Sequence, residues 1–139
     1  MDKSVLDTDI FSELLKGVST QVTEHARAYR ATFGIYTTSA ITVFEIVKGL
    51  HKVRREARIQ QFLHGLAAVE VLTLETPSAE LAGRITADLE RAGTPIGRAD
   101  PLIAAIALHH DYVLVTGNTD HYARIQACGY PLRLTNWRS

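Results

Sequence analysis

Short apolar runs alternate along the chain with longer segments whose apolar residues recur every three or four positions. Runs of the first kind predict β-strands, and the helical spacing predicts amphipathic helices. Strands are expected at residues 4–6, 35–37, 69–72, 112–115 and 131–134. Helices are expected at residues 10–15, 20–32, 40–49, 56–64, 77–92 and 122–127, with a further one through 103–108.

This alternation indicates an α/β fold in which helices cover a mainly parallel sheet of about five strands. The fully apolar run Tyr112–Val115 predicts a strand that is buried on both faces. In open parallel sheets, ligands bind outside the carboxyl ends of the strands. Asp7 and the turn Thr116–Thr119 each follow such an end, so we expect the functional site at that edge.

Composition bounds the size of the fold and the class of partner. The 139 residues contain no Ser/Gly-rich linker or internal repeat, which predicts one domain over residues 1–139. The hydrophobic share of 46% is enough for a core without disulfides or a structural metal. Basic and acidic residues number 15 each, which argues against a protein that coats DNA nonspecifically and leaves room for a local basic patch.

Three features of the sequence concern the cellular compartment. The lone cysteine, Cys128, rules out an intramolecular disulfide and is typical of a reducing cytosol. The first residues lack the basic start and apolar stretch of a signal peptide. No apolar run approaches the roughly 18 residues that a membrane span needs. We therefore expect a soluble, cytoplasmic protein with no membrane partner.

Three acidic residues lie where apolar segments give way to a loop or a helix: Asp7, Glu45 and Asp100. Carboxylates in apolar surroundings are costly unless a cation compensates them. Converging carboxylates are preferred ligands of magnesium and manganese, and such an ion activates water for attack on phosphate esters. The pattern therefore favours metal-assisted chemistry at the sheet edge.

Each of these acids also has a purely structural interpretation. Asp7 can begin a turn, and Glu45 can pair with Lys48 three residues on, along a solvated helix face. The apolar residues between Ile41 and Leu50 nevertheless leave that helix little polar circumference. Asp100 precedes a proline, and aspartate as the N-cap before proline is a common helix start. The residues alone leave these alternatives open.

Four segments and one isolated acid together resemble the PIN-domain family. They are Val5–Ile10, Glu45 in its apolar helix, Gly97–Ala107 with the spacing Gly-x-x-Asp-x-x-Ile-Ala-Ala, Val115–Thr119, and the tail Leu134–Trp137. Within the family, the chain is most similar to the VapC-type toxins of bacterial toxin–antitoxin pairs. The resemblance extends over nearly the whole chain, and it depends on the order and spacing of the segments.

The resemblance implies a three-layer α/β/α sandwich and an endoribonuclease that depends on Mg²⁺ or Mn²⁺. Asp7, Glu45 and Asp100 match the acidic triad of the family, and we expect them to be catalytic and to hold the metal. Asn118 falls where many members carry a fourth acid. This difference removes one charge, so we expect one firmly held ion and a direct or water-mediated role for Asn118.

Further candidates surround this set. Thr116 matches a hydroxyl position of the family and is expected to support a carboxylate ligand or a water. Thr8 and Asp9 are candidates for the same supporting role, with capping of the following helix as the alternative for both. Asp120 is a second candidate for the fourth acid; the alternative is a favourable charge in the first turn of its helix.

Basic residues beside the acids are candidates for contacts with RNA phosphates. They are Lys48, Lys52, Arg54, Arg55 and Arg98. A solvated surface position is the alternative for each of them. The six histidines show no metal-ligand spacing, and His121 is expected simply at the surface. Loops of transfer RNA and ribosomal RNA are both plausible substrates.

The first helix and the helix around Glu45 carry more apolar side chains than one small core needs. Those of the first helix are Ile10, Phe11, Leu14 and Leu15. The resemblance implies a homodimer and a groove for the tail of a DNA-binding VapB-type antitoxin, with an antitoxin arginine at the acidic site. Two alternatives stay open. One is a FitB-like, non-enzymatic partner of a DNA-binding protein, and the other is a PIN ribonuclease of RNA maturation.

Overall fold

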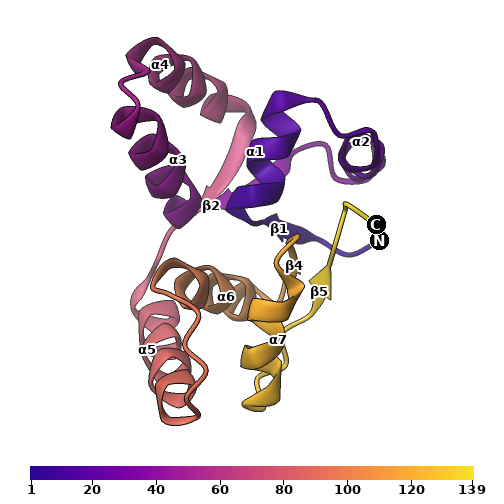
Figure 1. The fold of residues 1–139 in the computed structure, drawn as a ribbon. Helices are drawn as coiled ribbons and strands as arrows, with labels where there is room; N and C mark the ends of the chain where they lie inside the picture. The colour runs from indigo at the N-terminus through magenta and orange to yellow at the C-terminus, as the bar shows by residue number, and fades with distance from the viewer.

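The computed structural model describes all 139 residues, arranged as five strands between helices (Figure 1). The strands are β1 (Ser4–Leu6), β2 (Tyr36–Ser39), β3 (Val69–Leu72), β4 (Val113–Val115) and β5 (Leu134–Thr135). The helices are α1 (Thr8–Lys16), α2 (Thr20–Phe33), α3 (Ala40–Lys52), α4 (Glu56–Gly65), the short 3₁₀ helix η1 (Leu66–Ala68), α5 (Thr76–Arg91), α6 (Ala99–His110) and α7 (Thr119–Ala127).

All paired strands are parallel, as the alternating pattern predicts. One ladder has the order β1–β4–β5, with Val5 opposite Leu114, and the other pairs β2 with β3. The two ladders meet at β1 and β2, where the Thr38 hydroxyl donates a hydrogen bond of 2.8 Å to the Leu6 carbonyl. The expected sheet is therefore divided into two ladders, and a side chain joins them.

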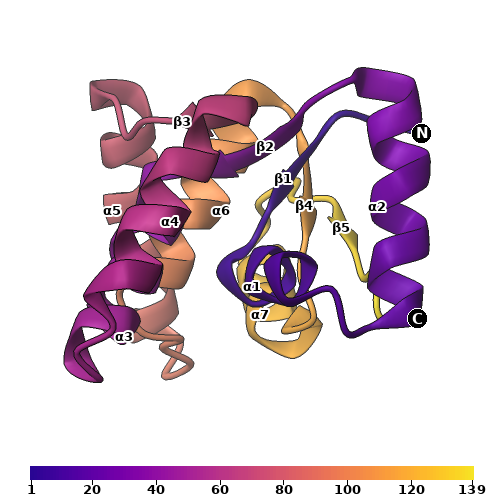
Figure 2. The same cartoon turned by 90° about the horizontal axis from the view of Figure 1, so that it is seen from above.

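Two hydrophobic cores lie on opposite faces of the strands. Val5 and Leu114 belong to the core formed with α5, α6 and α7, whereas the next residues along the two strands, Leu6 and Val115, belong to the core formed with α1 and α2. Figure 2 shows α2 on one side of the strands and α5 and α6 on the other. This arrangement confirms the three-layer sandwich and the burial of β4 on both faces.

Boundaries of the predicted elements agree with the structure to within a few residues. The last strand comprises Leu134–Thr135 instead of residues 131–134, and Pro131 has no amide hydrogen for a ladder. Helix α6 begins at Ala99, so Asp100 is its second residue and the N-cap interpretation of Asp100 was wrong. No helix combines the length and apolar character needed to cross a membrane.

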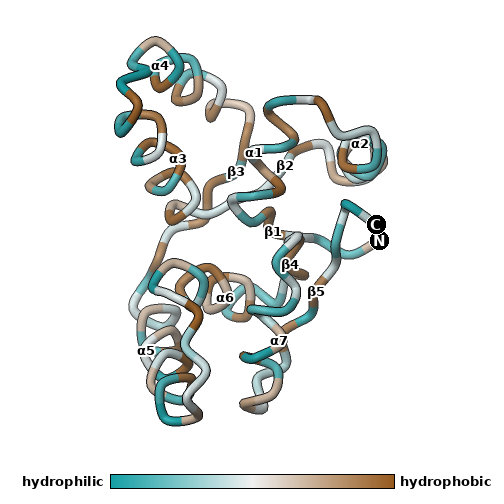
Figure 3. The backbone as a smooth tube through the Cα atoms, viewed as in Figure 1, coloured by the Kyte–Doolittle hydropathy of each residue, from teal (hydrophilic) through white to brown (hydrophobic).

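Helix α3 begins as the sequence predicts. Ser39 is its N-cap, and the Ser39 hydroxyl accepts a hydrogen bond of 3.2 Å from the Thr42 amide. Hydrophobic positions recur along this helix (Figure 3), yet Thr42 is its only fully buried residue, and the Phe44 side chain is 61% exposed. The apolar surface of α3 is therefore only partly used by the folded chain.

Candidate active site at the carboxyl ends of β1 and β4

Asp7 is held by hydrogen bonds immediately after β1. It is also the N-cap of α1, and its Oδ1 accepts a bond of 2.7 Å from the Thr8 amide. Its Oδ2 accepts 2.8 Å and 3.2 Å bonds from the hydroxyls of Thr116 and Tyr122. The side chain is buried, with 5% of its surface exposed. Three donors, from the start of α1, the end of β4 and α7, therefore fix this carboxylate in one orientation.

The surroundings of Asp7 disfavour its negative charge. Burial is the main cause that raises the pKa of Asp7 from 3.8 to about 7, followed by the nearby charge of Asp9 and, more weakly, that of Asp100. The hydrogen bonds from Thr116 and Thr8 act in the opposite direction without offsetting it. Asp7 is thus a buried carboxylate near other acids, and a cation at this point would relieve its charge.

Asp100 and Asn118 converge on one imidazole. The Nδ1 atom of His121 lies 3.3 Å from Asp100 Oδ2 and 3.3 Å from the side-chain nitrogen of Asn118. His121 lies at the surface as expected, with 39% of its side chain exposed, and its ring also contacts a predicted catalytic acid. Asp120 is exposed in the first turn of α7. Of the two candidates for the fourth position, Asn118 is the one that shares the His121 ring with Asp100.

Glu45 is connected to Asp7 through Thr8. The Thr8 hydroxyl donates a 2.5 Å hydrogen bond to Glu45 Oε1, while the Thr8 amide donates to Asp7. The alternative pairing of Glu45 with Lys48 is not found; the Lys48 ammonium lies 5.7 Å from the centre of the Phe44 ring. Thr8 therefore spans two of the three predicted acids, as expected for a residue that supports the site.

Thr116 and Asp9 hold the turn after β4. Thr116 is buried; its hydroxyl donates to Asp7 and accepts a bond of 2.9 Å from the Asn118 amide. Asp9 Oδ2 accepts a 3.1 Å bond from the Gly117 amide. Neither Thr8 nor Asp9 is the N-cap of α1, so that alternative was wrong. The two residues instead connect the start of α1 to the neighbouring elements of the site.

The donor set fits a hard divalent ion that retains part of its water shell. No three His, Cys, Asp or Glu side chains are grouped closely enough to hold a metal by themselves. Asp7 and Glu45 are instead linked through Thr8, whose amide donates to Asp7 and whose hydroxyl donates to Glu45. Burial and the neighbouring acids raise the pKa of Asp7. Mg²⁺ commonly uses one or two carboxylates and takes its remaining ligands from water and substrate phosphates. The residues present are compatible with that mode.

A groove of about 500 Å³ runs between α3 and α6 beside the acids. Glu45 and Lys48 line one wall, and Arg98 and Asp100 line the other. The remaining basic candidates, Lys52, Arg54 and Arg55, are exposed at the end of α3 and in the following turn, and they do not line the groove. The structure therefore brings two of the five predicted RNA contacts next to the acids.

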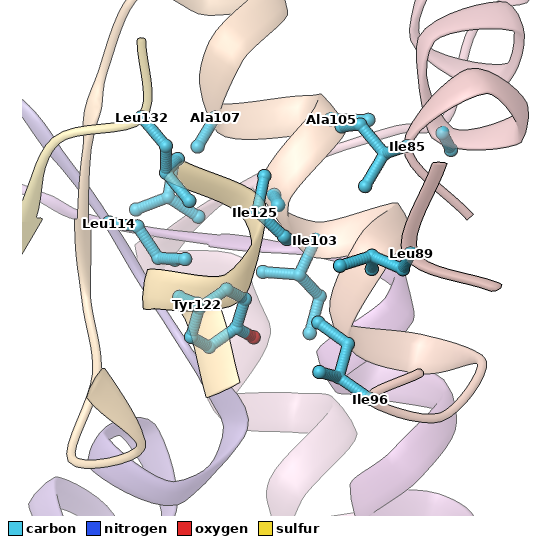
Figure 4. Packing of buried hydrophobic residues seen from close by; sticks show 13 residues of the cluster. Ile85, Leu89, Ile96, Ile103, Ala105, Ala107, Leu114, Tyr122, Ile125 and Leu132 are labelled. Carbon is cyan, nitrogen blue, oxygen red and sulfur yellow. The ribbon is translucent and has the colours of Figure 1, made fainter. Parts of the chain in front are cut away.

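Tyr122 is not among the residues predicted for the site, yet its hydroxyl lies there. Its ring packs among Leu114, Ile103 and Ile125 in the core (Figure 4), and its hydroxyl reaches Asp7. Burial and then the charges of Asp7 and Asp100 raise the pKa of Tyr122 well above its usual value. An aromatic residue at helical spacing indicates only a core position, so the contact with Asp7 could not be predicted from the sequence.

Comparison with known proteins agrees with this arrangement. A PIN domain profile matches residues 4–127. The tRNA(fMet)-specific endonuclease VapC of Shigella flexneri is 29% identical over 138 residues, with 99% of each chain covered. Ribonuclease VapC2 of Haemophilus influenzae is 31% identical over 141 residues, also with 99% of each chain covered. The solved structure of DNA-bound VapBC from Salmonella typhimurium gives a TM-score of 0.80 at 29% identity, covering 99% of each chain.

Proposed function

Because the chain belongs to the PIN-domain family and to its VapC type, we propose that it is a metal-dependent endoribonuclease toxin that cuts transfer RNA and is neutralised by a small antitoxin. The observation that carries the chemistry is the buried carboxylate of Asp7, which three donors orient and whose pKa is raised by burial and by the neighbouring acids. The choice of transfer RNA follows the activity named for the Shigella flexneri relative.

Asp7, Glu45 and Asp100 would hold one Mg²⁺ or Mn²⁺ ion, one or two of them directly and the rest through water, with Asn118 assisting directly or through a water. Bound there, the ion would supply an activated water and offset charge on the phosphodiester under attack. The contribution of the chain is to keep its acids in place before substrate arrives. Thr116, Tyr122 and the Thr8 amide do this for Asp7, and the Thr8 hydroxyl does it for Glu45.

The groove between α3 and α6 offers a path for the RNA backbone. Lys48 and Arg98 lie on opposite walls of it, so a phosphate entering between them approaches Glu45 and Asp100 with compensated charge. Lys52, Arg54 and Arg55 would extend this basic surface beyond the groove. The chain has no net charge, so attraction of RNA depends on this local patch rather than on the whole molecule.

A second groove, of about 570 Å³, lies between α1, α3 and α4 and suits the antitoxin. Its lining is largely apolar and includes Phe11, Leu15, Ile46, Leu50 and Phe62. Ile10 and Phe11 prove to be core residues, whereas Leu15 is 57% exposed. An apolar antitoxin segment would fill this groove, and an arginine beyond it would pair with the acids. A homodimer remains a prediction, to be tested by light scattering.

The proposal is tested by producing the chain in bacteria without its antitoxin and sequencing new RNA 5′ ends. We expect growth arrest, discrete breaks in transfer RNA, and relief of both by the antitoxin. Asp100→Asn should abolish both effects, while Asp120→Asn, the same change at an exposed site, should keep them. Breaks in precursor RNA without arrest would favour RNA maturation. If folded protein causes neither growth arrest nor RNA breaks, the result would favour the non-enzymatic alternative, a partner of a DNA-binding protein.

A further inference from the structure

The C-terminal tail returns to the candidate active site. The Thr135 carbonyl accepts a 2.9 Å hydrogen bond from the Thr116 amide, so the tail is paired with the end of β4. Beyond it, Trp137 is 5% exposed and packs 5.7 Å from the Tyr29 ring, centre to centre. The residue that follows Trp137 is therefore held in a fixed region of the molecule.

That residue, Arg138, bridges two carboxylates on α1. Its Nε donates a 2.9 Å hydrogen bond to Glu13 Oε2, and its Nη1 lies 3.5 Å from Asp9 Oδ2. The hydrogen bond to Glu13, followed by the charges of Asp9 and Glu13, raises the pKa of Arg138. Its own amide donates to Asn136 Oδ1 at 2.9 Å. Hydrogen bonds from both the backbone and the side chain thus hold Arg138 in place.

The guanidinium also lies against the turn that supports Asp7. A Cβ atom added to Gly117 would come within 2.0 Å of Arg138 Nη1 and 2.9 Å of Asp9 Oδ2. Glycine is therefore needed here to admit the arginine, and not for an unusual backbone angle. Asp9 Oδ2 accepts from the Gly117 amide. Arg138 and Asp9 consequently pack together against Gly117, the residue that follows Thr116.

We propose that Arg138 is a positioning residue of the nuclease. It fixes Asp9 against the Gly117 amide, which holds the turn after β4, and the turn presents the Thr116 hydroxyl to Asp7. The route from Arg138 to Asp7 is a sequence of direct contacts through side chains and one peptide unit. The inference depends on the proposed ribonuclease function, because the residue positioned is the acid that we assign to the metal.

The test compares cleavage of a transfer RNA with Mn²⁺ by the full-length protein and three variants. Arg138→Ala removes the guanidinium, and Gly117→Ala displaces it while keeping every charge. We expect each to lower kcat by roughly tenfold to a hundredfold with KM for RNA unchanged, since misplaced catalytic groups act on the chemical step. Arg133→Ala is the matched control: Arg133 also joins two carboxylates, Asp2 and Asp111, away from the site, and its loss should leave kcat unchanged.

Two further measurements separate positioning from other roles. Trp137 is the only tryptophan, so an unshifted emission spectrum shows that the tail is still docked. If Arg138 acted only through its charge, Arg138→Ala would bind Mn²⁺ more tightly and keep a normal kcat. If Arg138 positions the turn, kcat falls in both Arg138→Ala and Gly117→Ala. Wild-type kcat in either variant, or a red-shifted Trp137 emission that reveals tail release, would overturn the role of Arg138. Absence of cleavage by the wild-type protein would refute the proposed function, and this inference with it.

Discussion

The Asp7 carboxylate receives three hydrogen bonds and still has a pKa of about 7. The reason is that burial and the neighbouring acids Asp9 and Asp100 outweigh the donors. A buried aspartate with a raised pKa lowers the free energy of unfolding when it is ionised. Such destabilisation is tolerated where function requires the charge. A divalent ion would pair with the charge, so we expect metal binding and ionisation of Asp7 to be coupled.

The raised pKa of Asp7 predicts a pH-dependent stability of the metal-free protein. In the unfolded chain Asp7 loses its proton near pH 4, and in the folded chain near pH 7. Between these values the folded state binds more protons, so the stability contributed by Asp7 falls as pH rises. Asp7→Asn removes this loss. We expect it to raise the free energy of unfolding at pH 8 by a few kcal/mol, on the order set by the pKa difference, and to change it little below pH 4.

Urea unfolding with chelator, at several pH values, checks this expectation. Asp120→Asn is the matched control, because Asp120 is exposed and should leave the pH dependence as in the wild type. The same pH dependence in Asp7→Asn and the wild type would show that Asp7 is not buried as an ionisable group. Such a result would also weaken the argument for a cation at this position.

Whole elements were largely predictable from the chain, whereas the contacts between their ends were not. Helical spacing predicts α3, and the apolar run predicts β4. Local propensity supports the alternative of Asp100 as an N-cap, but the helix begins one residue earlier, at Ala99. The bond from Tyr122 to Asp7 and the Arg138 bridge join distant residues, and no local pattern encodes them.

Helices α1, α3 and α4 leave apolar surface between them, which we assign to the antitoxin. Leu15→Glu places a charge in this groove at a side chain that is already 57% exposed. We expect the free energy of unfolding to change by less than about 0.5 kcal/mol and the antitoxin Kd to rise at least roughly tenfold.

Calorimetric titration of the antitoxin into each protein measures the effect of the Leu15 change. Val18→Glu provides the control, since Val18 is 79% exposed and does not line the groove. Equal weakening by both changes would point to a general charge effect, and no weakening by Leu15→Glu would place the antitoxin elsewhere.

At the scale of the whole molecule, the two cores share the same strands. Successive residues of β1 and β4 belong to opposite cores, so neither core can be lost while the strands stay in place. Of the candidate active-site acids, Asp7 directly follows β1, whereas Glu45 and Asp100 lie on α3 and α6. The position of Asp7 relative to Asp100 therefore depends on both cores.

This sharing predicts one cooperative unfolding transition. Ile103 is fully buried in the core with α5 to α7, whereas Trp137 belongs to the other core. We expect Ile103→Ala to cost about 2–5 kcal/mol and to shift the Trp137 fluorescence transition together with the loss of helical circular dichroism. The exposed control Val18→Ala should shift neither. A Trp137 transition that stays at its wild-type midpoint in Ile103→Ala would show that the cores unfold independently.

The metal-dependent nuclease activity is best examined by cleavage of purified transfer RNA by antitoxin-free protein with Mg²⁺, with Mn²⁺ and with chelator. Asp100→Asn and the exposed control Asp120→Asn, purified identically, exclude a contaminating nuclease. We predict discrete fragments that require the metal, persist in Asp120→Asn and fall at least about a hundredfold in Asp100→Asn. Equal cleavage by Asp100→Asn and the wild type, or cleavage that survives the chelator, would contradict a metal-dependent site built on these carboxylates.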